Sequence, residues 1–328
     1  MPYVSVVVPT RNRSDLVVRA VHSVQTQTFG DFEIVVVIDG KDPATVEALR
    51  MISDDRLRWL ELVESVGGAE ARNIGVRNAV GYWIALLDDD DEWLPAKLQE
   101  QLEIGRTAAR QCLIATRFID SKPNAQIVQP GVAPKQGQPI SEYLLAETSM
   151  LGFRNGFLQT STWLAPREVF IRVPFTKGLP RNQETDWLLR AVPALSLELH
   201  VVWKTLVIFH NEASTGRITS RSDWQDTTQW AVSGGHFTPK ALAFFFAIVC
   251  VPAARLNGEP LSVFCCLLRQ LREAGGRFTF KSAWLFFASW FVFPYGRFGL
   301  RSKFQNLLNR RVAPPARADR TAKLGGMV

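Results

Sequence analysis

Short apolar runs alternate with stretches of helical periodicity along the first hundred residues. Apolar, largely β-branched residues dominate positions 3–8, 32–38, 57–63 and 82–87. Apolar residues recur at helical spacing over residues 14–30, 44–52 and 69–79. Strands of about six residues that alternate with helices of about ten predict right-handed βαβ crossovers. The pattern therefore indicates an α/β fold with a doubly wound, mostly parallel sheet.

Polar residues follow three of the predicted strands, at the edge where such sheets bind ligands. The carboxyl ends of parallel strands meet at one edge, and ligands lie beyond that edge. This rule selects residues 9–13, 39–42 and 88–92 before any chemistry is considered.

The pattern changes in the rest of the chain. Four prolines between positions 123 and 139 mark a loop-rich stretch, and helix or strand signals return at residues 157–164, 186–192 and 206–209. Strongly apolar helical segments follow at 241–251, 261–271 and 283–293. We expect an α/β domain over residues 1–235 and a helical, basic appendage over residues 236–328.

Charge is unevenly distributed between these two parts. The net charge is +7, but residues 267–328 hold 12 Lys and Arg against two acids, which leaves 26 basic and 29 acidic residues before them. The basicity therefore belongs to the appendage. The four cysteines form no CxxC pair, and the N-terminus has no basic leader, so a reduced, cytoplasmic protein is expected.

The strongest chemical signal is a run of carboxylates, Asp88 to Asp91 with Glu92, directly after an apolar strand. Like charges at this spacing repel one another, and a hard cation held by oxygens relieves the repulsion. Mg²⁺ or Mn²⁺ in such a site bridges one or two carboxylates to substrate phosphates. The alternative is a solvated acidic turn before a helix that starts near Pro95. Placement at the ligand edge favours the metal.

Weaker signals lie at the same edge. Asp39 ends the second strand, where a carboxylate can accept hydrogen bonds from a base or ribose, although Asp-Gly is also an ordinary turn. Residues 9–13 supply cations and backbone amides, and residues 67–75 place glycines and Arg72 at the start of a helix. The glycine spacings disfavour a Rossmann dehydrogenase and a P-loop NTPase.

Together these motifs resemble the family 2 glycosyltransferases of the GT-A fold. The matching segments are VSVVVPTRNR, the strand that ends at Asp39-Gly40, GGAEARNIGVRNAVGYWIALLDDDDEWLPAKL and, more loosely, LPRNQETDWLLR. The likeness is close over residues 3–105 and looser over residues 155–215. It implies a GT-A-like α/β fold and transfer of a sugar from a nucleotide-diphosphate donor, with a UDP-sugar as the first choice.

The resemblance also implies roles by position. Asp39 would bind the nucleotide base, and Asp90 would be the direct metal ligand at one end of a DxD-type motif that begins at Asp88. The remaining donor-binding positions are Pro9, Thr10, Arg13, Arg72, Asp88 and Asp89. Ile38 and Lys41 depart from the family pattern, so contacts to ribose and base are expected to differ here.

The family places its general base in an acidic pair before a helix. Glu184 occupies that position, and Asp186 competes with it because the chain has Gln183-Glu184 in place of two acids. An inverting transfer needs one carboxylate within reach of the acceptor hydroxyl. Simple helix N-terminal charges are the alternative. His210 ends a strand and would touch the metal or diphosphate, unless it is only structural, and Arg217 would close over the phosphates.

The appendage suggests a membrane surface as a partner. Each apolar segment is about 11 residues, short of the roughly 20 that span a bilayer. Aromatic residues followed by cations are typical of helices that lie in the interface of an anionic membrane, although packing on the α/β domain or on a second subunit explains them equally well. No nucleic-acid recognition motif accompanies the basicity. The predicted acceptor is a glycan or lipid-linked sugar at the inner face of the plasma membrane, in cell-surface polysaccharide synthesis. The alternatives are another metal-dependent nucleotide-sugar enzyme and a non-catalytic nucleotide-sugar-binding protein.

Overall fold

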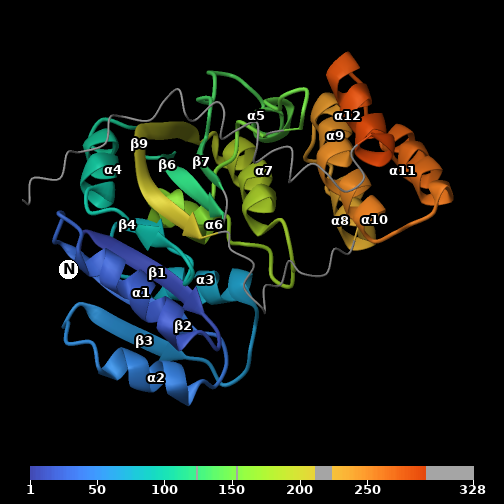
Figure 1. The fold of residues 1–328 in the computed structure, drawn as a ribbon. Coiled ribbons are helices and arrows are strands. Elements are labelled where there is room, and N and C mark those ends of the chain that lie inside the picture. Colours follow the sequence, from blue (N-terminus) through green and yellow to red (C-terminus); the bar gives the residue numbers. More distant parts are fainter. Residues whose placement is uncertain (123–124, 153, 211–223, 293–328) are drawn as a thin grey trace, which may run out of the picture.

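The computed structural model describes residues 1–122, 125–152, 154–210 and 224–292 (Figure 1). Arg217 and the aromatic and basic positions beyond residue 292 lie outside the described residues. The described chain forms one curled sheet covered by helices, with a group of helices at one end.

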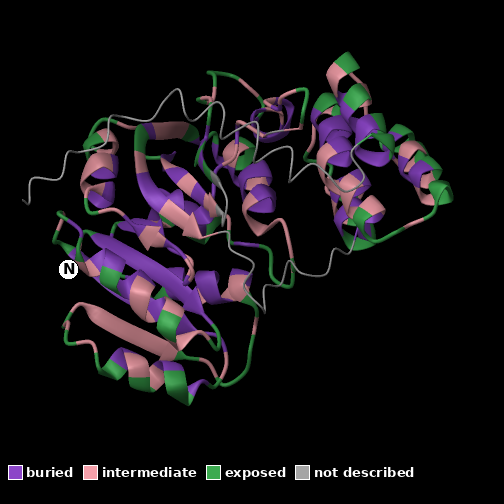
Figure 2. Ribbon diagram, in the orientation of Figure 1, coloured by how far each residue is buried: buried purple, intermediate pink, exposed green. Residues whose placement is uncertain are grey.

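The first half of the sheet, called the parallel half here, has the strand order β3-β2-β1-β4, and every neighbouring pair is parallel. Strands β1 and β2 are buried at every position, which explains their continuous apolar sequences (Figure 2). The predicted alternation of strands and helices is confirmed. Its elements are β1 Val4–Thr10, α1 Ser14–Gln25, β2 Phe32–Ile38, α2 Pro43–Arg50, β3 Leu57–Glu61, α3 Gly68–Asn78 and β4 Trp83–Leu86.

The second half of the sheet, called the mixed half here, continues from β4 in the order β8-β6-β9-β5, with β7 beside β6. Only β6 and β9 pair in parallel, and the other pairs are antiparallel. The elements are β5 Glu92–Trp93, α4 Lys97–Gly105, β6 Cys112–Lys122, β7 Ala125–Gln129, α5 Ile140–Ala146, η1 Thr160–Thr162, β8 Leu164–Pro166, α6 Arg167–Arg172, α7 Gln183–Leu195 and β9 Glu198–His210.

The remaining described helices pack together as a unit over residues 224–292, called the helical unit here (Figure 1). They are α8 Trp224–Ser233, α9 Pro239–Phe245, η3 Phe246–Cys250, α10 Val251–Leu256, α11 Leu261–Glu273 and α12 Phe280–Phe291. The unit begins with α8, which precedes the expected boundary at residue 235 and packs on η3 and α10. The division into domains stays a prediction.

The helix through α9, η3 and α10 is longer than its apolar sequence suggested. The sequence pattern predicted an apolar helical segment over residues 241–251. The helix runs unbroken from Pro239 to Leu256 and contains a π-helical turn before Pro252. Among the described residues, this is the one helix whose length and composition would allow it to cross a membrane, and 56% of it is buried inside the protein.

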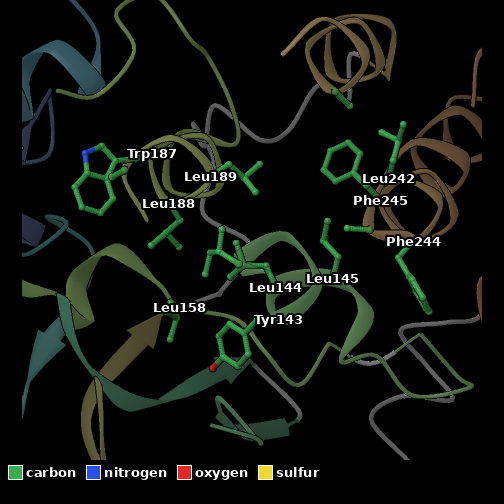
Figure 3. Packing of buried hydrophobic residues seen from close by; sticks show 14 of the residues in the cluster. Tyr143, Leu144, Leu145, Leu158, Trp187, Leu188, Leu189, Leu242, Phe244 and Phe245 are labelled. Carbon is green, nitrogen blue, oxygen red and sulfur yellow. The ribbon is translucent and has the colours of Figure 1, made fainter. Parts of the chain in front are cut away.

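The helical unit shares its core with the mixed half. Tyr143, Leu144 and Leu145 of α5 lie between Leu188 of α7 and the side chains of α9 (Figure 3). One continuous cluster of buried apolar residues extends from β1 and β4 to α12. Removing the unit would therefore expose the core beneath α5 and α7.

Candidate active site

The three segments selected at the ligand edge meet in the structure. The backbone N–H of Asp39 donates to the carbonyl of Thr10 over 2.8 Å, and the Thr10 hydroxyl donates to Asp89 Oδ2 over 2.8 Å. Strands β1, β2 and β4 end side by side, as parallel strands must. Pro9 is buried within β1 and lines this edge through the backbone of its strand.

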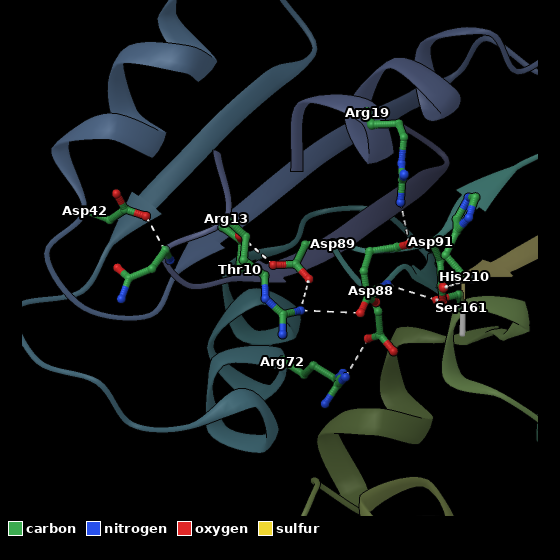
Figure 4. Close-up of polar contacts among 12 residues, drawn as sticks. Thr10, Arg13, Arg19, Asp42, Arg72, Asp88, Asp89, Asp91, Ser161 and His210 are labelled. Atoms are coloured by element: carbon green, nitrogen blue, oxygen red, sulfur yellow. Dashed lines mark hydrogen bonds and ion pairs between the residues drawn. The ribbon is translucent and has the colours of Figure 1, made fainter. Parts of the chain in front are cut away.

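The acidic turn, residues 88–92, is held by arginines that approach from the parallel half (Figure 4). Arg13 Nη1 lies 3.1 Å from Asp89 Oδ1 and 3.4 Å from Asp90 Oδ2. Arg19 donates to the carbonyl of Asp90 over 2.7 Å and pairs with Glu92 over 3.2 Å. These cations offset the repulsion between the carboxylates.

Burial differs among the carboxylates of this turn. Asp91 is completely buried, whereas the side chains of Asp88 and Asp90 are 17% and 20% exposed. Burial raises the pKa of Asp89 to about 6, against the charge of Arg13, and burial likewise raises the pKa of Asp91 well above its usual value. Among the four aspartates, the two that reach solvent are therefore those expected at the ends of the metal motif, and Glu92 is exposed beside them.

Arg72 joins the acidic turn to the start of α7. Its Nη2 donates to Asp88 Oδ1 over 2.5 Å, and its Nη1 donates to Gln183 Oε1 over 2.8 Å. Its guanidinium also lies 5.6 Å from the centre of the Phe175 ring. Burial lowers the pKa of Arg72, but the negative charges of Asp88 and Glu184 outweigh this effect and raise it. Arg72 therefore stays charged and brings Glu184 into the electrostatic field of the acidic turn.

The carboxylate of Asp39 stabilises the loop of residues 65–67, beside the predicted base pocket. It accepts hydrogen bonds from the Ser65 hydroxyl over 2.8 Å, the Val66 N–H over 2.6 Å and the Gly67 N–H over 3.0 Å. Gly67 has a φ of +85°, which favours glycine there. A carboxylate has about four acceptor positions, so these bonds leave room for a further donor. The predicted contact of Asp39 with a base stays a prediction.

Glu184 and Asp186 have very different surroundings, although only Thr185 lies between them. Asp186 accepts hydrogen bonds from Thr176, Arg190 and Trp230 over 2.7, 2.8 and 3.1 Å. Glu184 is half-buried, and within the described ranges its carboxylate has no hydrogen bond or ion pair. Asp186 thus fixes α7 in place, and the geometry favours Glu184 as the carboxylate available to a substrate.

Residues 5–172, just over half of the chain, match the family model described as glycosyl transferase family 2. The chain belongs to this family. The glycosyltransferase therefore transfers a sugar, and the resemblance seen in its sequence motifs is confirmed.

The glycosyltransferase is similar to curated bacterial proteins. It is 38% identical to the putative teichuronic acid biosynthesis glycosyltransferase TuaG of Bacillus subtilis, over 57% of this chain and 71% of the relative. It is 28% identical to the amylovoran biosynthesis glycosyltransferase AmsB of Erwinia amylovora, over 63% of this chain and 69% of the relative. A shorter match of 31% identity covers 33% of this chain and 43% of WfaP of Escherichia coli, a UDP-Glc:α-D-GlcNAc-diphosphoundecaprenol β-1,3-glucosyltransferase.

Solved structures share the fold. TarS of S. aureus in complex with UDP-GlcNAc aligns with a TM-score of 0.56 at 17% identity, over 84% of this chain and 88% of that chain. The mannosyltransferase PcManGT of Pyrobaculum calidifontis, in complex with GDP-Man and Mn²⁺, aligns with a TM-score of 0.50 at 17% identity, over 95% and 86% of the chains. The expected GT-A-like fold is confirmed.

Sequence reasoning missed Gln159 and Ser161 of the glycosyltransferase. The Ser161 hydroxyl donates to Asp91 Oδ2 over 2.6 Å and accepts the Asp88 N–H over 3.0 Å (Figure 4). Gln159 Nε2 donates to Asp91 Oδ2 over 2.7 Å and to Asp88 Oδ2 over 3.2 Å. Both residues are buried, and together they fix the shape of the acidic turn.

The oxygen ligands of the acidic turn suit the divalent cation that this fold family commonly uses. Asp88 and Asp90 offer partly exposed carboxylates, which are the ligands that Mg²⁺ and Mn²⁺ prefer. Within the described residues, no group of three or more acidic, His or Cys side chains is gathered to hold a metal by itself. This arrangement fits a cation that shares one or two carboxylates with substrate phosphates.

His210 lies beside the acidic turn at the end of β9. Its Nε2 lies 2.6 Å from Glu92 Oε1, and its backbone N–H donates to Asp91 Oδ1 over 3.3 Å. The structure thus brings His210 to the predicted place and pairs it with Glu92. Its role toward a metal stays a prediction.

Proposed function

We propose that the enzyme transfers a sugar from a nucleotide-diphosphate donor, a UDP-sugar first of all, to a hydroxyl of a glycan or lipid-linked acceptor with inversion at the anomeric carbon. The transfer serves cell-surface polysaccharide synthesis. The names of TuaG and AmsB, which refer to teichuronic acid and amylovoran, support this setting.

The observation that carries the proposal is the Arg72 bridge. Arg72 bonds both Asp88 and Gln183, which are far apart in sequence, and so brings the acidic turn and Glu184 to one site. An inverting transfer requires a base near the acceptor and a stabilised leaving diphosphate near the donor. The bridge joins the residues that would perform these two tasks.

The donor would lie along the edge formed by β1, β2 and β4. Asp39, Thr10 and Arg13 would contact the base and ribose, and Arg72 would interact with the phosphates. The complex of TarS with UDP-GlcNAc and the UDP-Glc in the name of WfaP support uridine as the first base to test.

Glu184 would act as the general base. A base must accept a proton from the acceptor hydroxyl, which requires a carboxylate that is not already committed to other donors. The hydrogen bonds of Asp186 to Thr176, Arg190 and Trp230 make it the weaker candidate.

Asp88 and Asp90 would hold Mg²⁺ or Mn²⁺, with Asp90 as the direct ligand. A bound divalent cation neutralises charge on the departing diphosphate. Gln159 and Ser161 keep the turn in shape for this task through Asp91. The Mn²⁺ bound to PcManGT supports the choice of metal.

The acceptor would be reached at the cytoplasmic face of the plasma membrane. The name of WfaP specifies a sugar on diphosphoundecaprenol, which is a lipid-linked acceptor. A sugar on a lipid carrier is confined to the bilayer surface, so an enzyme that uses one works beside that surface.

Calorimetric titration of UDP into the protein, with and without Mn²⁺, tests the donor site. We expect binding that requires Mn²⁺ and is lost in Asp90→Ala. Asp55→Ala is the matched control, because Asp55 is an exposed carboxylate outside the site.

The results of nucleotide binding and of product analysis test the donor site and the reaction separately. If UDP does not bind but dTDP or GDP does, the nucleobase of the donor would be reassigned and the donor site would stand. Failure of all three nucleotides to bind would remove the donor-site assignment. Release of UDP from a UDP-sugar on transfer would establish the reaction. Release of a sugar 1-phosphate, with transfer of the uridine monophosphate group, would contradict it.

A further inference from the structure

Helix α12 is strongly apolar on both its buried and its exposed sides, and Lys281 is its one charged residue. Leu285, Phe286 and Ala288 face the other helices of the helical unit. Four aromatic residues of the same helix remain partly exposed to solvent, and we call them the aromatic stripe. They are Phe280, Trp284, Phe287 and Phe291, with exposed fractions of 84%, 41%, 46% and 56%.

The spacing of the stripe aligns it along the helix. At about 100° per residue, its four positions fall within an arc of about 60° and extend over about 16 Å of helix. A helix that is apolar all round is normally enclosed, either in a core or in a membrane. The exposed side of α12 therefore lacks the apolar surroundings expected for such a helix.

Helix α11 of the same unit provides the internal comparison. Its exposed positions include Ser262, Cys265, Arg269 and Arg272, as expected for a helix in contact with water. The two helices pack through Phe264, whose ring lies 5.2 Å from that of Phe291. Within the described residues of the helical unit, exposed aromatic side chains are thus confined to α12.

A loop of the mixed half extends the apolar surface. Trp284 Nε1 donates to the carbonyl of Met150 over 3.1 Å, which places this loop against the stripe. Met150 and Leu151 are 43% and 42% exposed. An apolar surface shared by two parts of the molecule marks an interaction site.

Basic residues flank α12 in the sequence. Arg272 and Arg277 are exposed shortly before α12, and Lys281 lies within it. Residues 293–328 follow directly after the helix and contain eight Lys and Arg against one Asp. A second copy of the chain bound through this face would bring like charges together.

We propose that the aromatic stripe docks the enzyme onto an anionic lipid bilayer, with α12 lying in the plane of the interface. Aromatic side chains partition into the headgroup region, and cations beside them are attracted to anionic lipids. This inference deepens the proposed function, because a lipid-linked acceptor would be presented at that surface.

Flotation of the full-length protein with phosphatidylglycerol-containing vesicles tests the proposal. We expect binding that weakens with salt and is weaker on pure phosphatidylcholine. Phe280→Glu/Phe287→Glu should weaken the apparent vesicle affinity at least about tenfold, because apolar contact with the interface is lost and charge repulsion is added.

The matched control is Met51→Glu/Val63→Glu. Met51 and Val63 are 79% and 78% exposed, lie in the parallel half and give the same change in net charge. The control should bind vesicles as the wild type does. Phe280→Glu alone, at the most exposed stripe position, should show a smaller loss and keeps the test valid if the double variant unfolds.

Equal vesicle binding by the stripe variants and the wild type would overturn the proposal. A wild type that ignores vesicles but forms a dimer, with the stripe variants monomeric in light scattering, would identify a self-association face instead. Loss of binding only on deletion of residues 293–328, with the stripe intact, would assign the membrane contact to that segment and also reject the stripe.

Turnover of UDP-sugar with a water-soluble acceptor separates this proposal from the proposed function. Stripe variants should keep that turnover. If the protein binds vesicles but releases no UDP from any donor, the docking proposal would be supported and the proposed reaction would be rejected.

Discussion

The parallel half and the mixed half contribute different chemistry to the same site. The parallel half supplies charged groups, namely the arginines and the carboxylates of the acidic turn. The mixed half supplies neutral donors in Gln159 and Ser161 and the carboxylate of Glu184. In the proposed mechanism, charge for the leaving diphosphate would come from the ends of the parallel strands, whereas η1 would shape the acidic turn and α7 would present the base. Substitutions in the parallel half and in the mixed half should therefore affect donor binding and the proposed proton transfer separately.

The largest effect is expected from Glu184→Gln, which removes the proposed base and leaves the parallel half intact. Turnover should fall by about two to four orders of magnitude with the donor Kd unchanged. Single-turnover rates and UDP titrations measure the two quantities.

Asp186→Asn is the contrast to that variant. It weakens the bonds to Thr176, Arg190 and Trp230, so the free energy of unfolding should fall by about 1–3 kcal/mol. Turnover per folded molecule should stay within a few-fold of wild type. An inactive but stable Asp186→Asn protein beside an active Glu184→Gln protein would reverse the two roles.

Ser161→Ala tests whether the mixed half shapes the acidic turn. The variant removes one donor to Asp91 and one acceptor for the Asp88 N–H. The Mn²⁺ concentration for half-maximal turnover should rise about 10–100-fold, as for other residues that position metal ligands.

Thr116→Val is its control, because the buried Thr116 hydroxyl has no hydrogen-bond partner in the described structure. The control should leave the Mn²⁺ dependence unchanged. An equal shift in both variants would mean that general loosening of the core, and not the turn, sets metal affinity.

A smaller effect concerns Lys97 of α4, which is completely buried in the mixed half. Its Nζ donates to Gln101 over 2.8 Å and lies 3.8 Å from the centre of the Trp93 ring. Burial lowers the pKa of Lys97 well below 10.5. The unfolded chain therefore binds this proton more tightly than the folded one, and the free energy of unfolding should rise as pH increases from the lowered pKa toward 10.5.

The rise is at most about 1.4 kcal/mol per pH unit and should be absent in Lys97→Met. Urea unfolding between pH 7 and pH 10 measures it. Identical pH slopes for wild type and variant would show that Lys97 does not titrate in this range.

The smallest effect is expected in the parallel half itself, at Glu33. Burial raises the pKa of Glu33, but hydrogen bonds from Ser5, Val80 and Arg58 outweigh burial and bring it below 4.5. Its stabilising contribution is full above pH 4.5 and is lost as pH falls through the lowered pKa.

Glu33→Gln should therefore be less stable than wild type at neutral pH by about 1 kcal/mol and should lose less stability on acidification. Thermal melts from pH 7 to pH 3 compare the two proteins. A constant difference in Tm over this range would contradict the assignment.

The sequence predicted the parallel half closely because three of its strands, β1, β2 and β4, are buried at every position. The strand Phe32–Ile38 matches the expected range, and the neighbouring elements differ by a few residues at their ends. Uniform burial produces an uninterrupted apolar sequence, which is readable without knowledge of tertiary contacts.

The mixed half was harder to predict for a physical reason. Strand β6 carries Arg117 and Asp120 within its sequence, and β9 is half-exposed along most of its length, so neither presents a continuous apolar run. The bonds of Gln159 and Ser161 to Asp91 cross about 70 residues, and the Arg72–Gln183 bond crosses 111. No local pattern encodes contacts at such distances.

The hydrogen bond from Trp230 to Asp186 limits how the molecule can be divided. Trp230 belongs to the helical unit, yet its indole completes the hydrogen bonds of a carboxylate two residues from Glu184. The helical unit is thus not an exchangeable module. A chimera that takes this unit from another family member would need to retain an indole at position 230, or the helix that presents Glu184 would lose one of its anchors.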